Sequence, residues 1–185
     1  REMNWFNKYL KGFRRGEFTI LTGHTGSGKT TFQNQYSLEF AKKGIPTLFC
    51  SFELKNEVVL TNMIRQFSGE SFDSSPDRFE YWAEQFQSLP MYFQKLFGST
   101  TMDKVIQIID YTVEVHGVTH VVLDNLQFML GTQGKGFEKF DLQDELVSRL
   151  RSLATDKNIH VTLVIHPRKS IEHEDLSIAS IFGTA

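Results

Sequence analysis

The sequence has little of several features that define other classes of protein. It holds one cysteine, Cys50, at the end of an apolar run. This excludes an intrachain disulfide framework and a cysteine-rich metal site, and we expect the thiol to be buried. No run of about 18 apolar residues is present, so no membrane-spanning helix and no membrane partner are expected. The formal net charge is only -2, so bulk charge does not draw the chain to nucleic acid.

What is present suffices for one folded domain. The 185 residues are 40% hydrophobic, which allows one substantial core. Short apolar stretches alternate with segments of helical periodicity. We expect strands at residues 18–22, 46–52, 91–93, 118–124 and 159–165, and helices at 30–43, 56–67, 77–87, 99–116 and 142–154. Strands that are apolar throughout and separated by helices predict an α/β fold, with a mostly parallel central sheet flanked by helices on both faces.

A glycine-rich loop follows the first expected strand and precedes the first helix. Its residues match the pattern G-x-x-x-x-G-K-[ST], which is the P-loop or Walker A motif. The loop consists of Gly23, His24, Thr25, Gly26, Ser27, Gly28, Lys29 and Thr30, and Thr31 follows in the helix. Backbone N–H groups and the helix N-terminus would bind phosphate, Lys29 would contact the β- and γ-phosphates, and Thr30 would bind Mg²⁺. The pattern therefore predicts ATP and Mg²⁺ as ligands.

Three further polar residues come directly after expected strands, where parallel sheets bind ligands. Asp124 is the candidate acid that holds Mg²⁺, usually through water, although an aspartate there can also cap a turn. Glu53 could orient and deprotonate an attacking water if its strand neighbours the first one; otherwise it is a surface glutamate. His166 could sense whether the γ-phosphate is present, although an isolated histidine can be structural.

Basic residues in two polar segments are candidates for contact with nucleic acid. Arg168 and Lys169 follow the last expected strand, Lys135 lies in the glycine-rich segment 131–136, and Lys139 follows it. A few basic groups suffice for phosphate contacts, so we predict DNA binding by these four residues. The alternative is a pair of solvated loops.

With these motifs in place, the sequence resembles the RecA-like helicase domain of the hexameric replicative DNA helicases. It is most similar to the branch that contains the mitochondrial twinkle helicase and the phage primase–helicases. The resemblance rests on residues 14–17, 23–30, 51–53, 120–129 (HVVLDNLQFM), 160–169 (HVTLVIHPRK) and 179–184 (ASIFGT). It implies Glu53 as the catalytic base, Asp124 as the Walker B acid and His166 as the γ-phosphate sensor.

The same resemblance implies a setting for the domain. It implies a ring, a hexamer or a heptamer, whose central channel binds single-stranded DNA through the loops after Asn125 and after His166. It implies unwinding of forked DNA during replication, in the mitochondrial matrix or nucleoid. Residues 1–185 would be the RecA-like ATPase core without the C-terminal part of the domain and its arginine finger. We therefore expect weak ATPase activity from this piece alone.

Two other functions are compatible with a phosphate loop and an acidic partner. One is a recombinase-type or clock-type RecA-fold ATPase without helicase activity; the blocks at 160–169 and 179–184 argue against it. The other is a nucleotide-binding switch without catalysis. The presence of Glu53 argues against that function, because such a switch does not require a general base.

Overall fold

The computed structural model describes residues 8–9, 11–72, 75–94, 100–125, 127 and 137–166, with the backbone alone for 137–141. Its centre is a sheet with the strand order β1-β5-β4-β2-β3, in which all neighbours are parallel. The strands are β1 (Phe18–Thr22), β2 (Thr47–Ser51), β3 (Met91–Phe93), β4 (His120–Asp124) and β5 (His160–Ile165). The helices are α2 (Lys29–Lys42), α3 (Asn56–Ser68), α4 (Pro76–Gln87), α5 (Met102–His116) and α7 (Phe137–Asp156). Every expected strand and helix is present, with ends shifted by a few residues.

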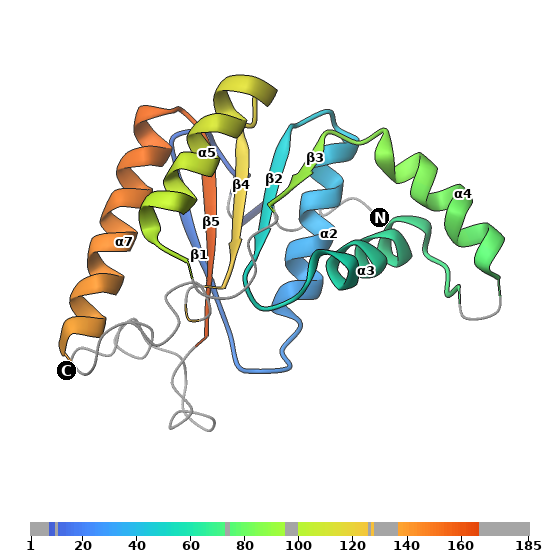
Figure 1. Ribbon diagram of the computed structural model, residues 1–185, viewed down its shortest axis with the longest axis horizontal. Helices are drawn as coiled ribbons and strands as arrows, with labels where there is room; N and C mark the ends of the chain where they lie inside the picture. The colour runs from blue at the N-terminus through green and yellow to red at the C-terminus, as the bar shows by residue number, and fades with distance from the viewer. Residues whose placement is uncertain are drawn as a thin grey trace.

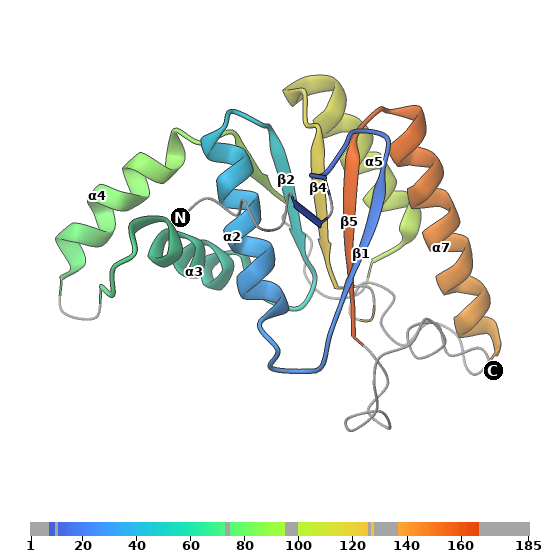
Figure 2. The ribbon, with the colours of Figure 1, turned by 180° about the vertical axis from the view of Figure 1, so that it is seen from behind.

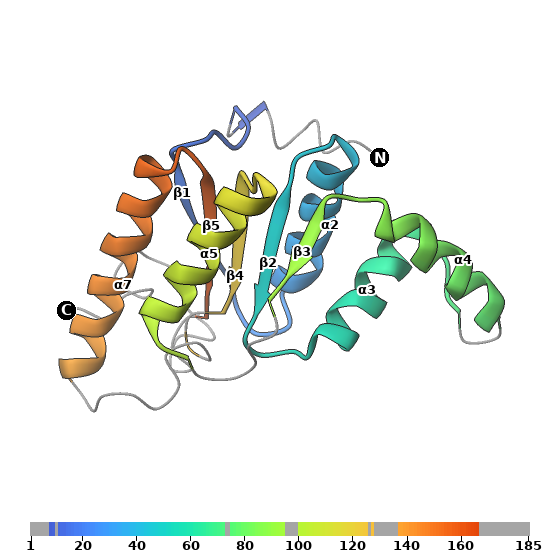
Figure 3. The same cartoon turned by 45° about the horizontal axis from the view of Figure 1, so that its top comes forward.

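Helices cover both faces of the sheet, as the apolar strands predicted. Helices α5 and α7 lie on one face and α2 on the other, and α3 and α4 extend past the β3 edge (Figures 1 and 3). Alternate residues of β2 separate the two layers of the core. Leu48 and Cys50 belong to the cluster under α5 and α7, whereas Phe49 belongs to the cluster with α2, α3 and α4. This alternation follows from the two-residue repeat of a strand.

The sheet order does not meet the condition that was placed on Glu53. We expected Glu53 to lie beside the phosphate loop if its strand neighboured β1, but β5 and β4 separate β1 from β2. Apolar composition shows that β2 is buried and does not show which strand lies beside it. The carboxyl ends of β5, β4 and β2 are consecutive along one edge of the sheet, and this edge also holds the loop between β1 and α2 (Figure 2).

Local signals set the ends of the helices. The Thr101 hydroxyl caps α5 by accepting a hydrogen bond of 3.4 Å from the Lys104 backbone N–H. Gly117 ends the same helix in the left-handed region, at a φ of 64°, which glycine adopts without steric cost. Between them, Val105 and Ile109 form a buried stripe at helical spacing.

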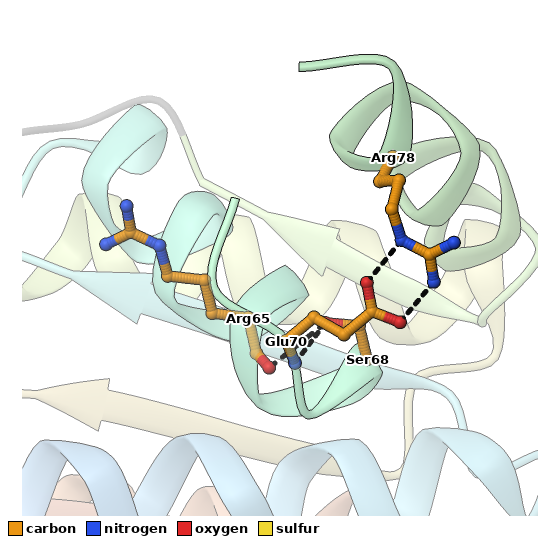
Figure 4. Close-up of polar contacts among 4 residues, drawn as sticks. All are labelled: Arg65, Ser68, Glu70 and Arg78. Atoms are coloured by element: carbon orange, nitrogen blue, oxygen red, sulfur yellow. Dashed lines mark hydrogen bonds and ion pairs between the residues drawn. The ribbon is translucent and has the colours of Figure 1, made fainter. Parts of the chain in front are cut away.

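Helices α3 and α4 form an arm, and a group of polar contacts near the turn between them is drawn in Figure 4. The Ser68 hydroxyl donates to the Arg65 carbonyl at 3.2 Å and accepts from the Glu70 backbone N–H at 3.1 Å. The Glu70 carboxylate binds the Arg78 guanidinium through two hydrogen bonds, one of 2.6 Å from Nε. Inside the arm, the rings of Phe67 and Phe86 pack edge to face, with their centroids 6.1 Å apart. In the described ranges, no helix combines the length and the apolarity that crossing a membrane requires.

Candidate nucleotide-binding site

The loop between β1 and α2 has the backbone geometry of a phosphate cradle. Gly26 and Gly28 lie in the left-handed region, at φ values of 79° and 85°, which side-chain-bearing residues rarely adopt. A Cβ atom on Gly23 would lie 2.8 Å from the Ser27 hydroxyl, so a larger residue at this position would displace the Ser27 side chain. Residues 25–28 are exposed and Gly28 is the N-cap of α2, so the loop backbone and the helix N-terminus are open to an anion.

Lys29 places its ammonium group at the centre of this loop. Its Nζ donates to the carbonyls of Gly23 and His24, at 2.7 and 2.9 Å, and the residue is only 8% exposed. Burial lowers the pKa of Lys29, while the carboxylates of Asp124 and Glu53 oppose that shift. The lysine is thus a partly desolvated cation between the loop and two acids.

Asp124 and Thr30 form the candidate metal position. The Thr30 hydroxyl donates to Asp124 Oδ2 at 3.2 Å. Asp124 is 2% exposed, and its Oδ1 has no hydrogen-bond partner among the described residues. Burial raises the pKa of this carboxyl to about 6, with the Thr30 hydrogen bond opposing the shift. An unpaired buried carboxylate oxygen beside a hydroxyl fits Mg²⁺, a hard cation that takes oxygen ligands.

Glu53, Asp124 and His166 meet at this edge of the sheet. Each offers one ligand atom, and the three atoms lie within 4.8 Å of one another. They come from the ends of β2, β4 and β5, which are consecutive in the sheet. Burial lowers the pKa of His166, and Lys29 lowers it further, while Glu53 raises it. The three residues that the sequence analysis singled out therefore share one site, although their roles stay predictions.

Two amide side chains, neither of which was among the residues singled out from the sequence, also belong to the site. Asn125, which is fully buried, donates to Glu53 Oε2, and its Nδ2 lies 3.3 Å from His166 Nε2. Gln127 Nε2 donates to the His166 carbonyl at 2.8 Å, and the His166 N–H donates to Gln127 Oε1 at 3.1 Å. In the sequence, both amides closely follow a strand that ends in a candidate metal ligand, and both lie in the block 120–129 on which the resemblance rests.

The remaining candidates divide into two groups. Thr31 is exposed on the first turn of α2, and its carbonyl accepts a hydrogen bond of 3.0 Å from Gln66. Lys135, Arg168 and Lys169 lie outside the described residues, and for Lys139 the backbone of α7 alone is described. DNA binding by these four basic residues stays a prediction.

Fold and loop together define the class: a P-loop nucleotide-binding domain of RecA-like fold. The chain belongs to the AAA domain family, which matches residues 5–172. It is 23% identical, over 189 residues, to a DNA helicase/primase of Enterobacteria phage T3, covering 95% of this chain and 33% of the phage protein. The chain thus spans a third of that relative's length. A solved structure described as an ATPase domain matches 96% of this chain and 68% of its own length, with a TM-score of 0.81 and 12% identity, and this likeness shows the fold.

Proposed function

We propose that this chain is the ATPase motor domain of a replicative DNA helicase. It binds ATP and Mg²⁺, and it couples hydrolysis to movement along single-stranded DNA and to unwinding of forked duplexes. The observation that carries the proposal is the convergence of Glu53, Asp124 and His166 at the edge of the sheet that holds the phosphate loop. Both relatives support it: one is described as a DNA helicase/primase and the other as an ATPase domain.

The contacts of the site assign a task to each side chain. Lys29 exchanges its bonds to the Gly23 and His24 carbonyls for bonds to phosphate oxygens. Asp124 and Thr30 would hold Mg²⁺, which supplies positive charge against the phosphates when bound. Each of these groups stabilises charge that develops during phosphoryl transfer.

Glu53 is the general base of the proposed reaction. Asn125 donates to its Oε2, which fixes the carboxylate and leaves Oε1 to accept a proton from water. His166 lies across from Glu53, where its imidazole can contact the γ-phosphate. Loss of that phosphate changes the contacts of His166 and so the position of the segment after β5.

Assembly and location belong to the same proposal. The chain forms a ring of six or seven copies, and a neighbouring subunit supplies an arginine that completes each site. The ring encloses single-stranded DNA and works in mitochondrial DNA replication. Resemblance to the replicative helicases supports each of these points, and electron microscopy of the full-length protein with a non-hydrolysable ATP analogue tests the ring.

The decisive experiment is Glu53→Gln in the full-length protein that contains this chain. Glutamine keeps the size of the side chain and an oxygen that accepts from Asn125, but it cannot take a proton from water. We expect kcat for ATP to fall by about 100-fold or more while the Kd of a fluorescent ATP analogue stays within about twofold.

The matched control is Glu57→Gln, which changes an exposed glutamate in the first turn of α3 and should leave both constants unchanged. Near-normal turnover in the Glu53→Gln protein, with ATP binding intact, would overturn the base assignment. Strand displacement on a forked duplex separates the helicase from a RecA-fold ATPase of recombinase or clock type: hydrolysis without displacement would favour the latter.

A further inference from the structure

Gln127 makes an unusual pair of contacts beside the proposed catalytic site. One side-chain amide both donates to the carbonyl and accepts from the N–H of the same residue, His166. The two residues are 39 positions apart in the sequence. A primary amide carries the same donor and acceptor as a peptide group, so Gln127 pairs with His166 as a neighbouring strand would.

These contacts occur where the pairing of the sheet has ended. The last pair between β4 and β5 joins Leu123 to Leu163, and the last pair between β1 and β5 joins Thr22 to Ile165. His166 therefore lies beyond both ladders. The Gln127 amide extends the connection between the β4 and β5 segments past the end of the sheet.

The imidazole of His166 is oriented from the same segment. Asn125 Nδ2 lies 3.3 Å from its Nε2 and also donates to Glu53. Residues 125 and 127 thus contact the ring and the main chain of His166, respectively. A misplacement of about 1 Å at a reacting centre can lower the rate by about 100-fold. A residue that fixes the main chain of His166 can therefore affect the rate of hydrolysis.

We propose that Gln127 is a positioning residue for His166: its amide fixes the main chain of His166 so that the imidazole faces Glu53 and the γ-phosphate position. This inference rests on the proposed function. In this proposal Gln127 does not contact the nucleotide. It affects turnover only by positioning the His166 ring. Removing the amide has a consequence for hydrolysis only while that ring is present.

A double-mutant cycle in the full-length protein tests this dependence. Gln127→Met keeps the length of the side chain and removes both hydrogen bonds. Gln127→Glu keeps the acceptor for the His166 N–H and removes the donor to its carbonyl. We expect either change to lower kcat by about tenfold, with the Kd of a fluorescent ATP analogue within about twofold. In a His166→Ala background, the same changes should lower kcat by less than about twofold.

The control is Gln107→Met on the exposed face of α5, which should behave as wild type in both backgrounds. If a Gln127 substitution lowers kcat by the same factor with and without the His166 ring, the residue acts on overall structure and the proposal is wrong. Wild-type turnover in His166→Ala also overturns it, because no ring would then need positioning. If Gln127→Met does not fold, the Gln127→Glu pair decides.

The proposed function is tested by a separate experiment from the positioning role of Gln127. It depends on the loss of turnover in Glu53→Gln, which the Gln127 cycle does not involve. A cycle without coupling, together with an inactive Glu53→Gln protein, would reject the positioning role and leave the ATPase assignment intact.

Discussion

Two acidic side chains in this domain, Asp124 and Glu70, lie in opposite electrostatic environments. At the strand ends, Asp124 is 2% exposed, and burial raises its pKa to about 6. In the α3–α4 arm, Glu70 is at the surface, and the hydrogen bond from Arg78 lowers its pKa. The first acid is held in an environment that disfavours its charge, and the second in one that favours it.

The different environments of Asp124 and Glu70 indicate different roles for the two acids. A buried carboxylate with an unpaired oxygen destabilises the folded state unless a cation binds it. The Glu70–Arg78 pair has its partners in place and is solvent-exposed, with side-chain exposures of 31% and 59%, so screening leaves it little influence on stability. We therefore expect changes at the strand ends to affect activity most, and changes at the arm surface to affect neither activity nor stability.

The largest effect is expected for Asp124→Asn in the full-length protein. Asparagine can still accept from Thr30, but it carries no charge for Mg²⁺, so Mg²⁺-dependent kcat should fall by about 100-fold or more. Without Mg²⁺, the isolated domain should become more stable near pH 7, by about 3 kcal/mol, because the buried charge is gone. Steady-state hydrolysis and urea denaturation measure the two effects.

The stability gained by Asp124→Asn depends on pH, because the pKa of Asp124 is raised in the folded protein. The folded-state pKa of Asp124, about 6, exceeds its ordinary value of 3.8, so the folded protein binds this proton more tightly than the unfolded chain. The cost of the charge is fully present above about pH 6, declines as the pH falls, and is absent below about pH 4. The advantage of Asp124→Asn should vanish over the same range. Asp103→Asn, on an exposed acid paired with Arg149, should show neither effect.

The sequence predicted the strands and helices of the fold and part of this site, for a physical reason. The phosphate loop and Asp124 are recognisable because their chemistry is encoded in neighbouring residues. The position of β2 was not, since strand order depends on packing between distant segments, and the condition placed on Glu53, that its strand neighbours the first one, is not met. Asn125 and Gln127 resemble ordinary loop residues in the sequence. Their contacts with His166 exist because β5 lies next to β4 in the sheet.

A smaller effect is expected inside the arm, from Phe86→Leu. Phe86 is 6% exposed and packs against Phe67 and Phe93, with ring centroids 6.1 and 6.3 Å apart. Loss of part of the ring should cost roughly 1 kcal/mol of unfolding free energy, measured by urea denaturation, and leave ATP affinity unchanged. Tyr81→Leu is the control, because Tyr81 lies on the same helix but is 55% exposed. Equal losses from both changes would mean that burial does not stabilise the arm.

The smallest effect is expected for Arg78→Met, which removes the ion pair and keeps an unbranched side chain. Arg78 and Glu70 are solvent-exposed, so water replaces each lost partner and the desolvation that makes a buried pair costly to break is absent. The Tm of the domain and the kcat of the full-length protein should both match wild type, at low and at high salt. A fall in Tm that disappears in high salt would show that this pair does stabilise the arm. A fall in kcat with an unchanged Tm would show that the arm surface contributes to catalysis. The functional distinction between the strand ends and the arm surface would then be wrong.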